Sequence, residues 1–186
     1  MSNSKCYITA ISGYLIPLVF IFIAATVSGW FSLVDNALSD LGHATKSNVS
    51  VVFNLGLSLG SFFIIVFSLT YSIRFNRLIT ILLILSGFFL NLIAIFDEVY
   101  GRLHFIVSVA FFTSLAALIV GYSVTYRSYL ISPVALLVGV LPWATHYLYN
   151  IPKGIAVPEL ISIFVALPFY MKYVRKSCKE RLSLGG

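Results

Sequence analysis

The stretch 78-LITILLILSGFFLNLIAIF-96 carries no charged side chain, although Arg77 precedes it directly and Asp97 follows it directly. A helix needs about 20 mostly apolar residues to cross the hydrocarbon core of a bilayer, because each residue advances it by only about 1.5 Å. This stretch has that length and composition. It therefore predicts a transmembrane helix that begins and ends at charged residues.

Five further apolar segments have a similar length and are separated by short polar links. They cover 9–30, 50–73, 103–126, 129–149 and 156–174. The chain of 186 residues is 60% hydrophobic and 10% charged, with a mean hydropathy of +1.00, which excludes an ordinary soluble domain. We therefore predict an all-α fold, an integral membrane bundle of six transmembrane helices that forms a single domain over residues 1–186.

The basic residues are divided unequally between the two ends of these helices. One end carries Lys46, Arg102 and Lys153. The other end carries Lys5, Arg74, Arg77, Arg127, Lys172, Arg175, Lys176, Lys179 and Arg181. Because basic loop residues are retained in the cytoplasm, we predict a multi-pass protein of the cell membrane with cytoplasmic N and C termini. The net charge of +6 is spread over loops and a tail, which indicates membrane lipids rather than nucleic acid as partners.

The two cysteines, Cys6 and Cys178, both fall on the predicted cytoplasmic side. Thiols in that compartment usually stay reduced. We therefore expect no disulfide bond between them.

A small-residue pattern occurs in the second segment, where Gly56 and Gly60 are four residues apart. Such a pattern lets two membrane helices approach closely. It is expected to seat a neighbouring helix of the same chain, and the alternative is a membrane-protein partner or a homo-oligomer.

Acidic residues and histidines gather at the end opposite the basic tail. They are Asp35, Asp40, Asp97, Glu98, Glu159, His43, His104 and His146. The amides Asn54 and Asn91 lie in the same halves of their helices. Polar groups at membrane depth need partners and usually face the bundle interior, so we expect Asn54, Asn91 and His146 to face one another.

The first connection, residues 31–50, is the only long one. At about 100° per residue, the polar residues Asp35, Asn36, Ser39, Asp40 and His43 share one face of a helix, and leucine, valine and alanine occupy the other. This pattern predicts a short amphipathic helix over 33–43. It would lie at the outer interface or over the mouth of the bundle.

These residues together indicate an outward-facing pocket of histidines and carboxylates. The candidate catalytic residues are His104, Asp40, Ser39 and Asp97. The candidate ligand-binding residues are Asn54, Asn91, Glu98, His146 and Glu159. Ser39 and His43 also have the spacing of a nucleophile and its base on one helix face.

Three other interpretations apply to the same residues. His43, His104 and His146 together have the donor atoms for a divalent metal such as zinc, and His104 with His146 those for a haem. No diagnostic metal motif such as H-E-x-x-H occurs. The plainest alternative is a polar cluster that only holds the helix ends together.

Four short motifs, in order along the chain, are similar to those of a known family. They are Asn36-Ala-Leu-Ser-Asp-Leu-Gly42, Phe53-Asn-Leu-Gly-Leu57, Asp97-Glu98 followed by Leu103-His104 and Phe111-Phe112, and Ile155-Ala-Val-Pro-Glu-Leu160. They resemble the domain of unknown function 998 family, multi-spanning membrane proteins of archaea and bacteria. The positions that match its motifs are Ser39, Asp40, Gly42, Asn54, Glu98, His104 and Glu159.

The resemblance implies a membrane fold but no settled activity. The sequence departs from the family pattern at Asp97, where a proline is expected, and His43 and His146 lie outside the motifs. We therefore expect a pocket that binds a lipid headgroup or a small polar ligand, with hydrolysis as an added option. The competing classes are a non-catalytic subunit or assembly factor of a larger membrane complex, and a small transporter.

Overall fold

The computed structural model describes residues 3–180, and every regular element in that range is helical. The six long helices are α1 (Asn3–Ser28), α2 (Ser50–Phe67), α3 (Arg77–Ile95), α4 (Arg102–Tyr126), α5 (Ile131–Tyr149) and α6 (Ala156–Glu180). Three short helices are η1 (Leu38–Gly42), η2 (Ser68–Ser72) and η3 (Glu98–Tyr100). Arg181, which we counted in the orientation prediction, lies outside the described residues.

All six long helices have the length and apolar composition needed to cross a membrane. The prediction of an all-α, multi-spanning bundle is therefore confirmed. The observed helices differ from the predicted segments mainly at the chain ends, where α1 begins at Asn3 and α6 continues to Glu180. Hydropathy cannot detect these extensions, because they consist of polar residues beyond the apolar spans.

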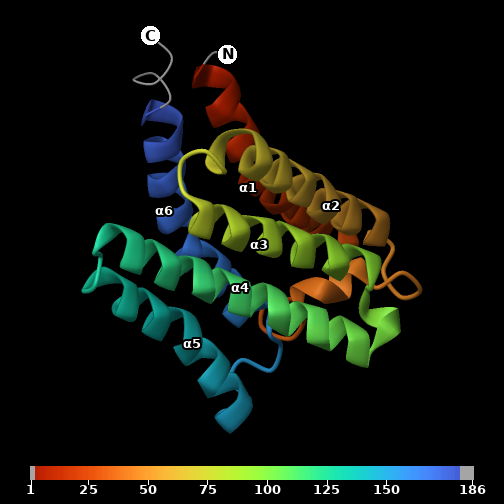
Figure 1. Ribbon diagram of the computed structural model, residues 1–186. Helices are drawn as coiled ribbons and strands as arrows, with labels where there is room; N and C mark the ends of the chain where they lie inside the picture. Colours follow the sequence, from red (N-terminus) through yellow and green to blue (C-terminus); the bar gives the residue numbers. More distant parts are fainter. Residues whose placement is uncertain (1–2, 181–186) are drawn as a thin grey trace.

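The first four long helices each pack against the next, and α6 returns to pack against both α4 and α1 (Figure 1). As a result the start of α1 and the end of α6 lie at the same end of the bundle (Figure 1). α5 packs mainly on α6 and only lightly on α4. We call the end that carries the start of α1 and the end of α6 the basic end. The opposite end, which carries Asp40, Asp97, Glu98 and Glu159, is the acidic end.

Specific residues begin and end the helices, which keeps most links short. α3 begins after Asn76, whose side-chain oxygen accepts the backbone N–H of Ile79 over 2.9 Å. α4 and α5 end at Arg127 and Asn150, whose φ angles of 53° and 55° are left-handed. Short links make consecutive helices antiparallel, so the acidic residues return to one end.

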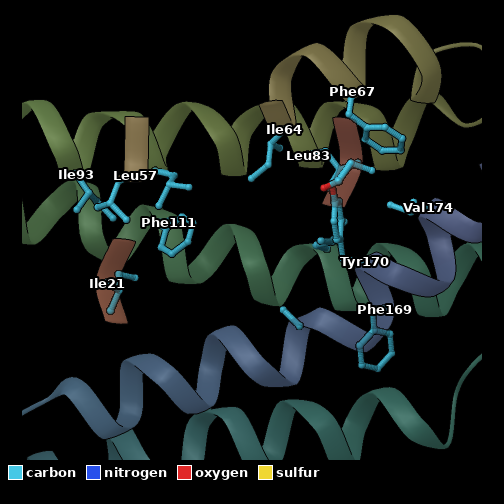
Figure 2. Packing of buried hydrophobic residues seen from close by; sticks show 14 of the residues in the cluster. Ile21, Leu57, Ile64, Phe67, Leu83, Ile93, Phe111, Phe169, Tyr170 and Val174 are labelled. Atoms are coloured by element: carbon cyan, nitrogen blue, oxygen red, sulfur yellow. The ribbon is translucent and has the colours of Figure 1, made fainter. Parts of the chain in front are cut away.

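Buried apolar side chains from α1, α2, α3, α4 and α6 form one core (Figure 2). Towards the basic end, the rings of Phe67 and Tyr170 meet edge to face with centroids 6.2 Å apart. The two glycines of α2 lie against α1. A methyl group added at Gly56 would overlap Phe20, and one at Gly60 would overlap Pro17. This small-residue face therefore seats a helix of the same chain.

The connection between α1 and α2 does not form the predicted amphipathic helix over 33–43. Only η1 is helical, and it is inserted between the helix ends, with Leu41 fully buried. The reason lies in competing hydrogen bonds. Asp40 Oδ2 accepts the N–H of Ala37 over 2.8 Å, and Asn36 Oδ1 accepts the N–H of Ser32 over 2.8 Å.

The link between α5 and α6 uses further backbone groups of this connection. Gly154 donates its N–H to the carbonyl of Val34 over 2.7 Å, and Ala156 donates to Asn36 over 3.0 Å. An added methyl group at Gly154 would overlap the backbone of Asn36, so the two segments touch through their main chains. Carbonyls used in this way are unavailable to an α-helix.

The expectation of two reduced cysteines is wrong. Cys6 near the start of α1 and Cys178 near the end of α6 form a disulfide, with a Cα–Cα separation of 5.8 Å. Both side chains are buried. The expectation rested on the compartment, and the sequence alone gives no sign that residues so far apart become neighbours.

We predict that reduction of this disulfide, or the substitution Cys178→Ser, lowers the thermal midpoint of the purified protein. The cross-link restricts the unfolded chain, and removing it from a protein typically costs about 2–5 kcal/mol. Differential scanning fluorimetry with and without reductant measures the shift. A Cys178→Ser variant should show no further response to reductant, and an unchanged midpoint would contradict the prediction.

Candidate ligand-binding site

A cavity of about 590 Å³ lies between α4, α5 and α6 and reaches the acidic end. Its polar lining is concentrated at that end, in Ser39, Glu98, His104, Ser108 and Glu159. The remaining wall is mostly apolar and continues towards the basic end. Its lining includes Val109, Phe112, Ala116, Ile119, Ala135 and Val140. The cavity thus joins a polar end to an apolar channel.

Glu98 belongs to η3 and reaches the polar end of the cavity. Its Oε1 atom accepts the hydroxyl of Ser39 over 2.6 Å, which links η3 to η1. Burial raises the pKa of Glu98 above its usual value, and the Ser39 hydrogen bond opposes this shift. A hydrogen bond with Asp40 and the negative charge of Asp40 raise the pKa further, whereas His104 lowers it.

Glu159 brings a second carboxyl to the same place from the first turn of α6. Its side chain is only 5% exposed. Its Oε2 atom accepts the backbone N–H of Leu38, at the start of η1, over 2.7 Å. Among residues 3–180, this is the only hydrogen bond of the Glu159 carboxyl, so Oε1 is left without a donor at the cavity wall.

His104 lies in the first turn of α4, and each of its ring nitrogens contacts a neighbouring oxygen atom. Nδ1 lies 2.8 Å from the carbonyl oxygen of Phe96, which can only accept, so Nδ1 donates a proton to it. Nε2 lies 3.3 Å from the hydroxyl of Ser108, one turn further along α4. These two contacts fix the orientation of the ring at the cavity wall.

Asp97 holds backbone segments together instead of facing the cavity. It is 7% exposed, and its two oxygens accept separate backbone N–H groups. Oδ1 binds Val99 over 2.8 Å and caps η3, while Oδ2 binds Ala44 over 3.1 Å and holds the residues after η1. Asp97 does not line the cavity. A proline here, as in the family pattern, would supply neither bond.

The other predicted ligand-binding polar residues lie away from the cavity. Asn54 donates its side-chain N–H to the carbonyl of Gly42 over 2.9 Å, and His146 contacts the carbonyl of Pro152 over 2.8 Å. The Asn91 side chain makes no hydrogen bond with the residues that the structure describes. The expectation that Asn54, Asn91 and His146 face one another is therefore wrong.

The predicted metal ligands His43, His104 and His146 are also held apart. His43 lies 3.4 Å from the hydroxyl of Thr45 rather than beside Ser39, so neither the zinc set nor the Ser39–His43 pair is formed. Within residues 3–180, no group of three or more His, Cys, Asp or Glu side chains has an arrangement that holds a metal ion. The residues that do converge are Ser39, Asp40, Glu98, His104 and Glu159.

The site also contains Ser108, Trp143 and the apolar channel, which were not predicted from the sequence. Ser108 follows His104 by four residues, a spacing that places both on one helix face and was available in the sequence. Trp143 lines the cavity, and its indole N–H donates to Ser162 of α6 over 2.9 Å. Gly139 also lines the cavity and has nothing within 4 Å of an added methyl group. Open space of this kind is invisible in a sequence.

These features define a polytopic helical membrane protein with a cavity that is polar at one end and apolar along its length. The family model described as "Protein of unknown function (DUF998)" matches residues 10–171, and the chain belongs to this family. The suspected resemblance is thereby confirmed. Neither a curated protein nor a solved structure matches the chain.

We predict that Asp97→Asn destabilises the fold, because an amide replaces one of two accepting oxygens with a donor that faces a backbone N–H. The cost is about 2 kcal/mol, as for the loss of a buried hydrogen bond to a charged group. Thermal unfolding in detergent measures it. Asp35→Asn is the matched control. Asp35 is exposed, and within residues 3–180 its carboxylate accepts a hydrogen bond only from the hydroxyl of Ser32. Equal effects of the two substitutions would contradict this assignment.

Proposed function

We propose that this protein binds a membrane amphiphile, with its headgroup at the acidic end and its tail in the apolar channel. The observation that carries the proposal is a single cavity in which Glu98, Glu159, His104 and Ser39 close one end of a long apolar wall. A small polar ligand would use only the polar end. A lipid matches both parts, so membrane lipids are the proposed partners.

The position of α5 supports entry from the bilayer. α5 packs lightly on α4, and both helices contribute to the cavity wall. The far side of α5 carries exposed apolar side chains such as Leu137 and Leu148. In a membrane these side chains contact lipid tails. A tail can therefore pass between α4 and α5 without crossing water.

The distribution of charge supports an orientation with the acidic end outside the cell and both termini in the cytoplasm, although the Cys6–Cys178 disulfide at the basic end is unusual for that compartment. At the basic end, Lys172, Arg175, Lys176 and Lys179 follow one another on α6. Basic residues near an anionic leaflet contribute about 1 kcal/mol each. Lys176 also lies 3.7 Å from the ring centre of Tyr126.

Binding without hydrolysis is the function that the geometry favours. The hydroxyl of Ser39 donates to Glu98 and His43 contacts Thr45 instead, so the predicted pair of Ser39 as nucleophile and His43 as base is not formed. Asp97 is used by two backbone N–H groups. A role as a non-catalytic subunit remains compatible with a bound lipid, and a stoichiometric partner after purification in mild detergent would indicate it.

We predict that Trp143 senses a lipid tail in the cavity. The chain has two tryptophans, Trp30 and Trp143, so Trp30→Phe leaves a single reporter. In bilayers of lipids brominated in the acyl chain, fluorescence of Trp143 should be quenched by the bound tail. Adding Gly139→Leu should reduce that quenching by about half, because the new side chain fills space in the channel.

The matched control is Leu137→Phe on the same helix, which enlarges an exposed side chain that does not line the cavity. It should leave the quenching of Trp143 unchanged. Equal quenching in the Gly139→Leu and parent proteins would show that Trp143 senses only surrounding lipid, and the proposal would fall. The added leucine meets no neighbouring atom at its Cβ, so misfolding is not expected to confuse the comparison.

A further inference from the structure

The polar end of the cavity has an unbalanced charge. Two of its lining residues are the carboxylic acids Glu98 and Glu159. Asp40, which does not line the cavity, hydrogen-bonds with Glu98. No lysine or arginine lines the cavity in the part of the chain that the structure describes. An anionic headgroup would therefore enter a site that already holds acidic groups, without a lysine or arginine to pair with.

One of these carboxyls also lacks a hydrogen-bond donor. Glu159 is 5% exposed and lines the cavity, and its Oε2 atom already accepts the N–H of Leu38. No donor from residues 3–180 reaches its Oε1 atom. Because Glu159 lines the cavity and this oxygen accepts no hydrogen bond from residues 3–180, an occupant of the cavity can bring the donor.

The neighbouring groups point to the same kind of occupant. Ser39 uses its hydroxyl proton on Glu98, and His104 uses its Nδ1 proton on the Phe96 carbonyl. Neither proton is free to meet a ligand. The cavity end thus offers acceptors, namely the oxygens of Glu98 and Glu159, and needs a ligand that donates.

We propose that the amphiphile bound in this cavity carries a protonated amine as its headgroup, which pairs with Glu159 and Glu98. This inference rests on the proposed function and adds the chemical class of the headgroup. An ammonium group supplies both the missing donor and the missing positive charge. A hydroxyl headgroup supplies the donor alone, and a carboxylate supplies neither.

The pairing has a pH dependence with a defined sign. Glu98 is faced by Ser39 and Asp40 from η1, by His104 from α4 and by Glu159 from α6. Burial and Asp40 raise the pKa of Glu98, so its carboxyl ionises at a higher pH than that of a free glutamate. Affinity for an amine should therefore increase as the pH rises through that pKa, whereas affinity for an alcohol should change little.

The test compares three probes with the same tail, tetradecylamine, tetradecanol and tetradecanoate, on the full chain carrying Trp30→Phe. Each is titrated against protein in brominated lipid, and recovery of Trp143 fluorescence measures displacement of the quenching tail. The amine should act at about tenfold lower concentration than the alcohol, as expected for one added charge-assisted hydrogen bond. The carboxylate should be the weakest.

Two substitutions assign the effect to the carboxyls. Glu159→Gln keeps an acceptor for Leu38 and removes the charge, and it should abolish the preference for amine over alcohol while alcohol binding persists. Glu98→Gln should flatten the rise of amine affinity with pH. Asp35→Asn, which removes an exposed charge at the same end, should alter neither result.

The outcomes separate the two proposals. If all three probes compete equally, or if the carboxylate competes best, the amine headgroup is excluded and lipid binding still stands. If no probe restores Trp143 fluorescence and Gly139→Leu has no effect, lipid binding itself is excluded. Persistent alcohol binding in Glu159→Gln shows that this variant is folded.

Discussion

Carboxylate oxygens that accept backbone N–H groups hold together the acidic end of this protein, and the cavity depends on them. Glu159 binds the start of η1, and Asp97 binds the residues after it. The segment between α1 and α2 carries polar backbone groups into a region with little water. Without such acceptors, burying those groups would be costly. The same bonds prevent a longer helix and fix Ser39 beside Glu98.

The four motifs described in the sequence analysis meet in this arrangement. The first motif supplies η1, the second supplies Asn54 beneath it, and the third and fourth supply Glu98, His104 and Glu159. Gly42 lies directly against α2, where a methyl group would come within 2.7 Å of Asn54 Oδ1 and of the Phe53 ring. Residues from motifs that are distant in the sequence thus contact one another at the acidic end.

The transmembrane helices could be predicted from sequence because the bilayer imposes length and apolarity on each segment separately. Features that depend on contacts between distant segments could not. The stretch 33–43 has helical periodicity, yet Asp40 and the Gly154 backbone divert its hydrogen bonds. The convergence of Ser39, Glu98, His104 and Glu159 was predicted only from their common position at one end of the helices. The distribution of polar residues between the two ends places them at one level but does not show which of them touch. Asn91, His43 and His146 belong to that level but do not line the cavity.

The bond between Cys6 and Cys178 has a topological consequence. It joins the first helix to the last, so the described chain from residue 6 to residue 178 is a closed covalent ring. A protease that nicks one exposed link would leave the two pieces attached, and the fragment sizes would appear only under reducing conditions. Lateral separation of α1 from α6 is likewise restricted near the basic end. Rearrangement of the bundle is then easiest at α5, which lies outside that α1–α6 contact.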